Sequence, residues 1–173
     1  MDGDAAKPAA GLTGLARRVI EGWALAGGLV LLGIALMSTW SSVAGVVFAK
    51  PLSGDFELVE MGVAVAVFMF LPYCQITDAN VTADIFTARA GVRTQALLKL
   101  LSAVIALGFG VLLTWRMYAG MLDYQQYVET TTILHIPIWY AYVPALISLA
   151  LLIMACVISM RDLLHEFRRA ASA

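Results

Sequence analysis

The chain has 173 residues, of which 61% are hydrophobic and only 13% are charged, and its formal net charge is −1. Soluble globular domains are about half apolar and about a quarter charged. This composition therefore excludes an ordinary soluble domain and indicates a protein that lies in a membrane.

Four uncharged runs separate the clusters of charged residues: 22–49, 61–77, 100–115 and 130–160. A helix needs about 20 mostly apolar residues to cross the hydrocarbon layer of a bilayer. The first and last runs exceed that length, and the two middle runs reach it with their flanking residues. The sequence therefore predicts an all-α integral membrane protein with four transmembrane helices, at about 22–47, 58–77, 97–119 and 136–159. We expect one four-helix domain over residues 1–173, in which residues 1–14 are a disordered lead-in.

The basic residues predict the orientation of these spans. Of the 11 Lys and Arg residues, all but Lys50 and Arg116 lie before span one, between spans two and three, or after span four. Because Lys and Arg remain on the cytoplasmic side, both termini and the middle loop are predicted to be cytoplasmic. The start of the second span, with Glu57 and Glu60, then lies at the outer interface.

The first span contains the polar run "STWSS" in its outer half, which predicts that one face packs on protein rather than on lipid. Pro72 is expected to kink the second span near its inner end. After that span, Val81, Ile85 and Phe86 recur at roughly helical spacing. The middle loop can therefore lie on the inner membrane surface as an amphipathic helix.

The third span has a small residue at every fourth position: Ser102, Ala106, Gly110 and Thr114. Such a ladder lets another helix approach closely, so we predict a packing face, either within this chain or against a partner. The fourth span opens with "HIPIWYAYVP", where Pro137 suits the first helical turn and the aromatic residues suit the outer interface.

The sequence has no pattern typical of a catalytic or cofactor site. Cys74 and Cys156 are isolated, and we interpret both as buried small hydrophobic residues. His135 and His165 are predicted on opposite sides of the membrane, too far apart to ligate one haem. No span has a charged residue near its middle, where a carrier places its ionisable groups. We expect no enzyme, no cofactor, no metal and no substrate site in this chain.

The carboxylates at the start of the second span have three interpretations. Asp55, Glu57 and Glu60 can stabilise the first turns through the helix dipole. Alternatively, Glu60 or Glu57 can pair with Arg116, which is predicted at matching depth in the third span. The third interpretation is binding of a coupling ion. We favour a structural role with a pair between Glu60 and Arg116.

Three stretches resemble one transporter family: the turn Gly54–Glu57 in "SGDFELVEMGVAVAVFMFLP", then "QITDANVTADIF" with Asp84, and "TTTILHIPIWYAYVPALISLALLIMA" with Pro137. Over about residues 15–168 the chain resembles the small membrane subunit (DctQ-like, Q subunit) of tripartite ATP-independent periplasmic (TRAP) transporters. The resemblance implies three components. A large membrane subunit carries an organic acid with sodium, a periplasmic substrate-binding protein delivers that substrate, and the small subunit is a fixed scaffold.

The resemblance also implies a multi-pass protein of the bacterial inner membrane. Its direct partner would be the large subunit, the binding protein would be part of the complex, and the lipid bilayer would surround it. No nucleic acid is expected as a partner. The alternatives are a membrane-anchor subunit of a respiratory or redox complex and a self-contained small carrier. The identity of the substrate would be determined by the partners.

Overall fold

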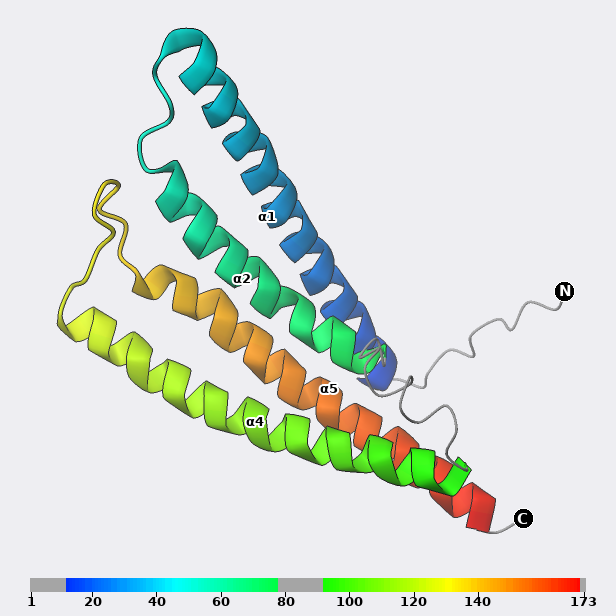
Figure 1. Cartoon of the computed structure of the whole chain (residues 1–173). Helices are drawn as coiled ribbons and strands as arrows, with labels where there is room; N and C mark the ends of the chain where they lie inside the picture. The colour runs from blue at the N-terminus through cyan, green and yellow to red at the C-terminus, as the bar shows by residue number, and fades with distance from the viewer. Residues whose placement is uncertain (1–11, 78–91, 172–173) are drawn as a thin grey trace, which may run out of the picture.

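The computed structural model describes residues 12–77 and 92–171 (Figure 1). These residues form four helices: α1 (Leu12–Phe48), α2 (Asp55–Ile76), α4 (Val92–Gln126) and α5 (Trp139–Ala171). Each contains a segment long and apolar enough to cross a membrane. The described residues contain no β-strand, and their one isolated bridge joins Thr130 to Pro137. The prediction of an all-α protein with four membrane-spanning helices is confirmed.

The helices are longer than the predicted spans. α1 begins at Leu12, inside the expected lead-in, and α4 continues to Gln126. An apolar run marks only the part of a helix that lies in hydrocarbon, whereas backbone hydrogen bonding continues into the polar regions on either side. Residues 1–11 and 78–91 lie outside the described residues, so the rest of the lead-in, the amphipathic middle helix and Asp84 lie outside them as well.

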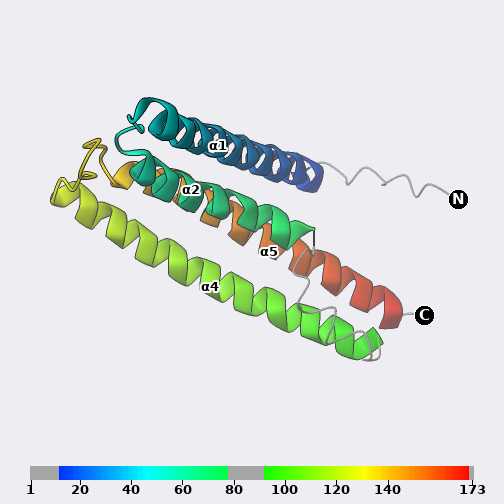
Figure 2. The same cartoon turned by 45° about the horizontal axis from the view of Figure 1, so that its top comes forward.

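The helices form an open row in the order α1, α2, α5, α4. Contacts are extensive between α1 and α2, between α2 and α5, and between α5 and α4. In both views α1 and α4 lie at opposite edges of the molecule (Figures 1 and 2). Because the row does not close into a bundle, large apolar side chains are exposed along all four helices. Such surfaces are stable only against lipid or another membrane protein.

The two described connections, residues 49–54 and 127–138, lie at the same end of the row (Figures 1 and 2). We name this the loop end. The start of α1 and the end of α5 lie at the opposite end. The chain therefore crosses the long dimension of the molecule four times in alternating directions.

Small residues allow the helices to pack closely. A Cβ atom at Gly27 would lie 2.9 Å from the Cβ of Met69, so glycine permits the approach of α1 to α2. The Trp23 indole on α1 donates a hydrogen bond of 2.9 Å to Ser148 Oγ on α5. The buried Ser148 hydroxyl in turn donates to the carbonyl of Pro144 at 2.7 Å. A polar contact thus joins two helices that are not neighbours in the row.

Candidate functional site

Gly54 sets the start of α2. Its backbone is left-handed, with φ 81° and ψ 12°, and its carbonyl accepts a hydrogen bond from the Leu58 N–H. A Cβ at this position would lie 2.5 Å from Cγ of Leu134, in the connection between α4 and α5. Glycine therefore serves both the backbone conformation, which costs other L-residues about 1–2 kcal/mol, and the close approach of Leu134.

Glu57 binds the same connection. Its Oε1 accepts the N–H of Ile133 at 2.7 Å, and its Oε2 accepts the N–H of Leu134 at 3.0 Å. Hydrogen bonds to an ionised carboxylate are about twice as strong as neutral ones. We call Gly54, Glu57, Ile133 and Leu134 the clasp, because they attach the connection before α5 to the start of α2.

The connection that the clasp holds is a compact turn. The Thr131 N–H donates to the Ile136 carbonyl at 2.9 Å, and the Ile138 N–H donates to the Glu129 carbonyl at 3.2 Å. Pro137 was expected in the first turn of the fourth span, but it lies before α5, which begins at Trp139. Pro137 lacks an N–H, and its carbonyl accepts from the Tyr140 N–H at 3.2 Å. Pro137 therefore forms part of this turn, and α5 begins just after it.

A second polar contact joins α1 to the start of α2. The buried Ser41 hydroxyl donates to Asp55 Oδ2 at 2.6 Å and accepts the Leu52 N–H at 3.1 Å. The other oxygen of Asp55 accepts the Phe56 N–H at 2.8 Å, which satisfies a free donor in the first turn of α2. Ser41 was not among the predicted site residues. The polar run "STWSS" was the available signal, since it predicted a protein-packed face.

The small-residue ladder on α4 faces α5 only in part. Gly110 is buried, and a Cβ there would lie 3.5 Å from Ile153 Cγ1 and 3.7 Å from Leu152 Cδ2. Thr114 donates its hydroxyl to the Gly110 carbonyl at 2.7 Å and is half-buried, as is Ala106. Ser102 is exposed, and the neighbouring Ala103 is buried in its place. The buried stripe is therefore offset from the fourfold spacing, because an α-helix has 3.6 residues per turn.

The expected pair between Glu60 and Arg116 is not formed. Both side chains are exposed, and no ion pair joins them within the described ranges 12–77 and 92–171. The reason lies in the order of the helices, since α5 packs against both α2 and α4 and lies between them (Figure 1). Of the two outer glutamates, Glu57 has a defined partner, and that partner is backbone rather than a basic side chain.

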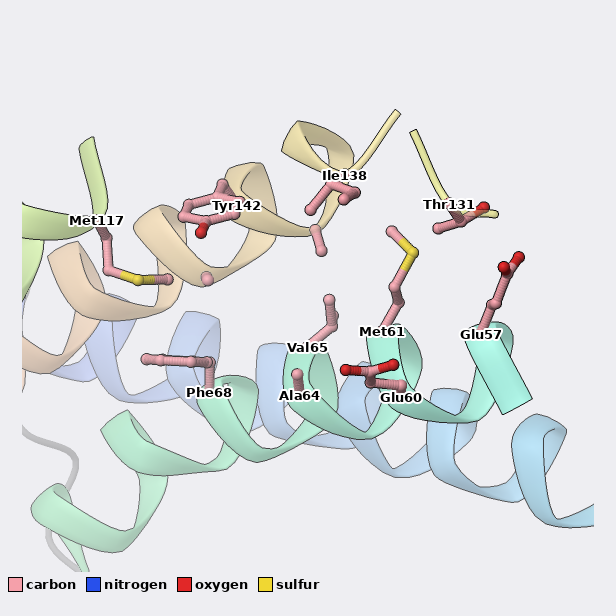
Figure 3. Close-up of a pocket in the computed structure, with 12 residues that line it drawn as sticks. Glu57, Glu60, Met61, Ala64, Val65, Phe68, Met117, Thr131, Ile138 and Tyr142 are labelled. Atoms are coloured by element: carbon pink, nitrogen blue, oxygen red, sulfur yellow. The ribbon is translucent and has the colours of Figure 1, made fainter. Parts of the chain in front are cut away.

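An apolar groove of about 320 Å³ begins beside the clasp and extends toward the middle of the row. Its wall on α2 consists of Glu57, Glu60, Met61, Ala64, Val65 and Phe68. Its opposite wall consists of Thr131, Ile138, Ala141, Tyr142 and Ala145, with Met117 from α4. Figure 3 shows Glu57 extending toward Thr131, whereas the Glu60 carboxylate lies beside Ala64.

These features hold helices and connections together. Among the described residues, no three His, Cys, Asp or Glu side chains gather closely enough to hold a metal ion. Cys156 is buried and Cys74 is half-buried, and both are free thiols. The arrangement is that of a hydrogen-bonded loop end beside an open apolar groove.

The family model described as "Tripartite ATP-independent periplasmic transporters, DctQ component" matches residues 34–166. The comparison with curated proteins and the comparison with solved structures returned no significant match.

Proposed function

Because the chain belongs to the DctQ component family of tripartite ATP-independent periplasmic transporters, we propose that it is the fixed scaffold for the large membrane subunit of such a transporter. The family is a transport component, so the chain is a membrane transport subunit and not an enzyme. In the proposed complex, the large subunit imports an organic acid with sodium, and a periplasmic binding protein delivers that acid. The complex lies in a bacterial inner membrane.

The observation that carries the scaffold role is the open row of helices. In an apolar 18-residue stretch of α4, only 11% of the residues are buried inside the chain, and in the corresponding stretch of α5 only 33% are. A self-sufficient bundle would bury one apolar stripe of every helix against its neighbours. Here the faces and edges of the row remain available for a larger membrane protein.

The positions of the charged residues support the same role. The uncharged runs leave no Asp, Glu, Lys or Arg in the middle of any span. Carriers place ionisable groups or broken helices near the middle of the membrane to bind substrate and coupling ions. Transport by this chain alone would lack such groups, so the transport site is proposed to lie in the large subunit.

Co-purification with the large subunit tests the proposal. Expressed together, the two chains should elute from a sizing column as one species with one copy of each. The isolated small subunit should release no heat when titrated with organic acids such as dicarboxylates or sialic acid. Binding of an organic acid to the isolated chain would contradict the scaffold role, and so would separate elution of the two chains under gentle detergent conditions.

A further inference from the structure

Glu60 is a charged residue in a groove that is otherwise mostly apolar, and the contacts of the clasp do not involve it. Its side chain is exposed on the groove wall of α2, one turn beyond Glu57. No Lys or Arg is among the described residues that line the groove. A carboxylate next to hydrocarbon requires a partner or water, since its charge is otherwise costly to keep. The free chain therefore presents a negative charge that has no cation opposite it in the groove.

The shape and lining of the groove suit a helix that approaches closely. Ala64 on one wall and Ala141 and Ala145 on the other are small, and small residues let membrane helices come into contact. Met61 and Phe68 provide adaptable and aromatic surface on the same wall as Glu60. An incoming helix can place large apolar side chains between these walls.

The lining of the groove around Glu60 favours a protein cation over a lipid amine. The carboxylate lies beside Ala64, along the groove wall, and not at the connection that Glu57 binds (Figure 3). Lys and Arg on a membrane helix extend long apolar stems along hydrocarbon and bring the charge toward the interface. A lipid amine at the interface can also reach Glu60, but the space between the alanine-lined walls suits a close-packed helix, which would carry such a side chain with it.

We propose that this groove is the docking surface for the large membrane subunit, and that a Lys or Arg near the loop end of one of its transmembrane helices pairs with Glu60. The proposal rests on the proposed scaffold function and specifies its contact surface. Glu57 holds the turn at the mouth of the groove, and Glu60 selects the partner helix by charge.

The first test measures complex yield with a tag on the large subunit. Glu60→Gln and Glu60→Lys should each lower the amount of co-purified small subunit by at least about tenfold, because removing one member of an interfacial charge pair leaves the other unpaired. Asp123→Asn is the matched control, since Asp123 is exposed on α4 and does not line the groove. The control should retain wild-type yield. Wild-type yield for both Glu60 variants would overturn the pairing.

The second test locates the contact with a photoreactive amino acid. At Ala64, in the groove, it should crosslink to the large subunit. At Ala35 it should not, although Ala35 is exposed on α1 at similar depth, next to the Ile34 that packs against Gly62. Adducts of Ala64 with phospholipid alone would show that lipid occupies the groove and would overturn the proposal. Crosslinks to the large subunit from Ala35 but not from Ala64 would overturn it as well.

Two controls separate this proposal from the scaffold function itself. The isolated Glu60→Gln chain should unfold at the same temperature as wild type. A lower unfolding midpoint would mean that the variant loses complex yield because it folds less stably, which would contradict docking at Glu60. If the wild-type chains fail to co-purify, the scaffold function fails. If the wild-type chains co-purify and the groove variants do so equally well, only the docking surface is overturned.

Discussion

At the residue scale, the two outer glutamates have different roles although they lie one turn apart on α2. Glu57 uses both carboxylate oxygens to accept backbone N–H groups from the connection before α5. Glu60 projects onto a groove wall, and no basic residue is among the described groove residues. Glu57 therefore attaches a connection within this chain, whereas Glu60 is proposed to pair with a residue of a second chain.

Replacing Glu57 should release the connection before α5. In Glu57→Gln an amide, with one oxygen and no charge, replaces a carboxylate that accepts two N–H groups, so at least one of the two bonds is lost and the other weakens. Hydrogen exchange at Ile133 and Leu134 should become faster, while amides in the middle of α5 keep their wild-type rates. Mass spectrometry of the loop peptide measures this change.

Glu60→Gln is the control for that experiment, because Glu60 makes no hydrogen bond to residues 131–134 in the structure. Its loop peptide should exchange at the wild-type rate. Equal acceleration in both variants would contradict the clasp and would indicate a general effect of charge at the loop end.

At the element scale, the packing of α4 against α5 depends on where glycine occurs. Gly110 faces Ile153 and Leu152, whereas a Cβ at Gly108 would meet nothing within 4 Å. Both residues lie on α4, so they have the same helix propensity and nearly the same depth. This pair separates the effect of packing from the effect of losing a glycine.

Gly110→Leu should destabilise the chain, because the new side chain must force α4 and α5 apart, and overpacking costs about 1–3 kcal/mol. Gly108→Leu should have little effect or stabilise α4 slightly, since leucine is a better helix former than glycine. Thermal unfolding in detergent compares the two variants. Equal unfolding midpoints for the two variants would mean that α5 accommodates the leucine side chain without loss of stability, which would contradict close packing at Gly110.

At the scale of the whole molecule, the loop end is proposed to face the periplasm. The connections 49–54 and 127–138 lie at one end of the row, and the start of α1 and the end of α5 lie at the other (Figure 1). The end with the two connections has only Lys50 and Arg116 in or near it, as the basic-residue rule requires of a periplasmic end.

Reporter fusions test this orientation. Fusions after Gly54 and after Gln125 should give a periplasmic signal, and a fusion after Arg93 should give a cytoplasmic one. A cytoplasmic signal at Gln125 would reverse the assigned depth of the clasp and the groove. Periplasmic signals at all three positions would contradict four alternating spans.

Each predicted span overlaps most of one helix, because an apolar run long enough to cross a membrane depends on one local quantity. The length of an apolar run must match the thickness of the hydrocarbon layer, and no other part of the chain changes that requirement. The family resemblance was also readable from the sequence, and the family match over residues 34–166 confirms it. The sequence therefore determined the number of membrane-spanning helices, their approximate positions and the class of protein.

Only the tertiary structure decided which helices are neighbours and which residues meet at the site. Small residues occur in every span, so many pairings of helices satisfy the same packing rule, and the sequence does not rank them. The place of α5 between α2 and α4 leaves Glu60 and Arg116 unpaired with each other. The partners of Glu57 are backbone N–H groups of residues 133 and 134, which almost any sequence carries. A backbone N–H is the same at almost every residue, so the sequence does not show which one will meet a given side chain. Such contacts are decided by the long-range geometry of the fold.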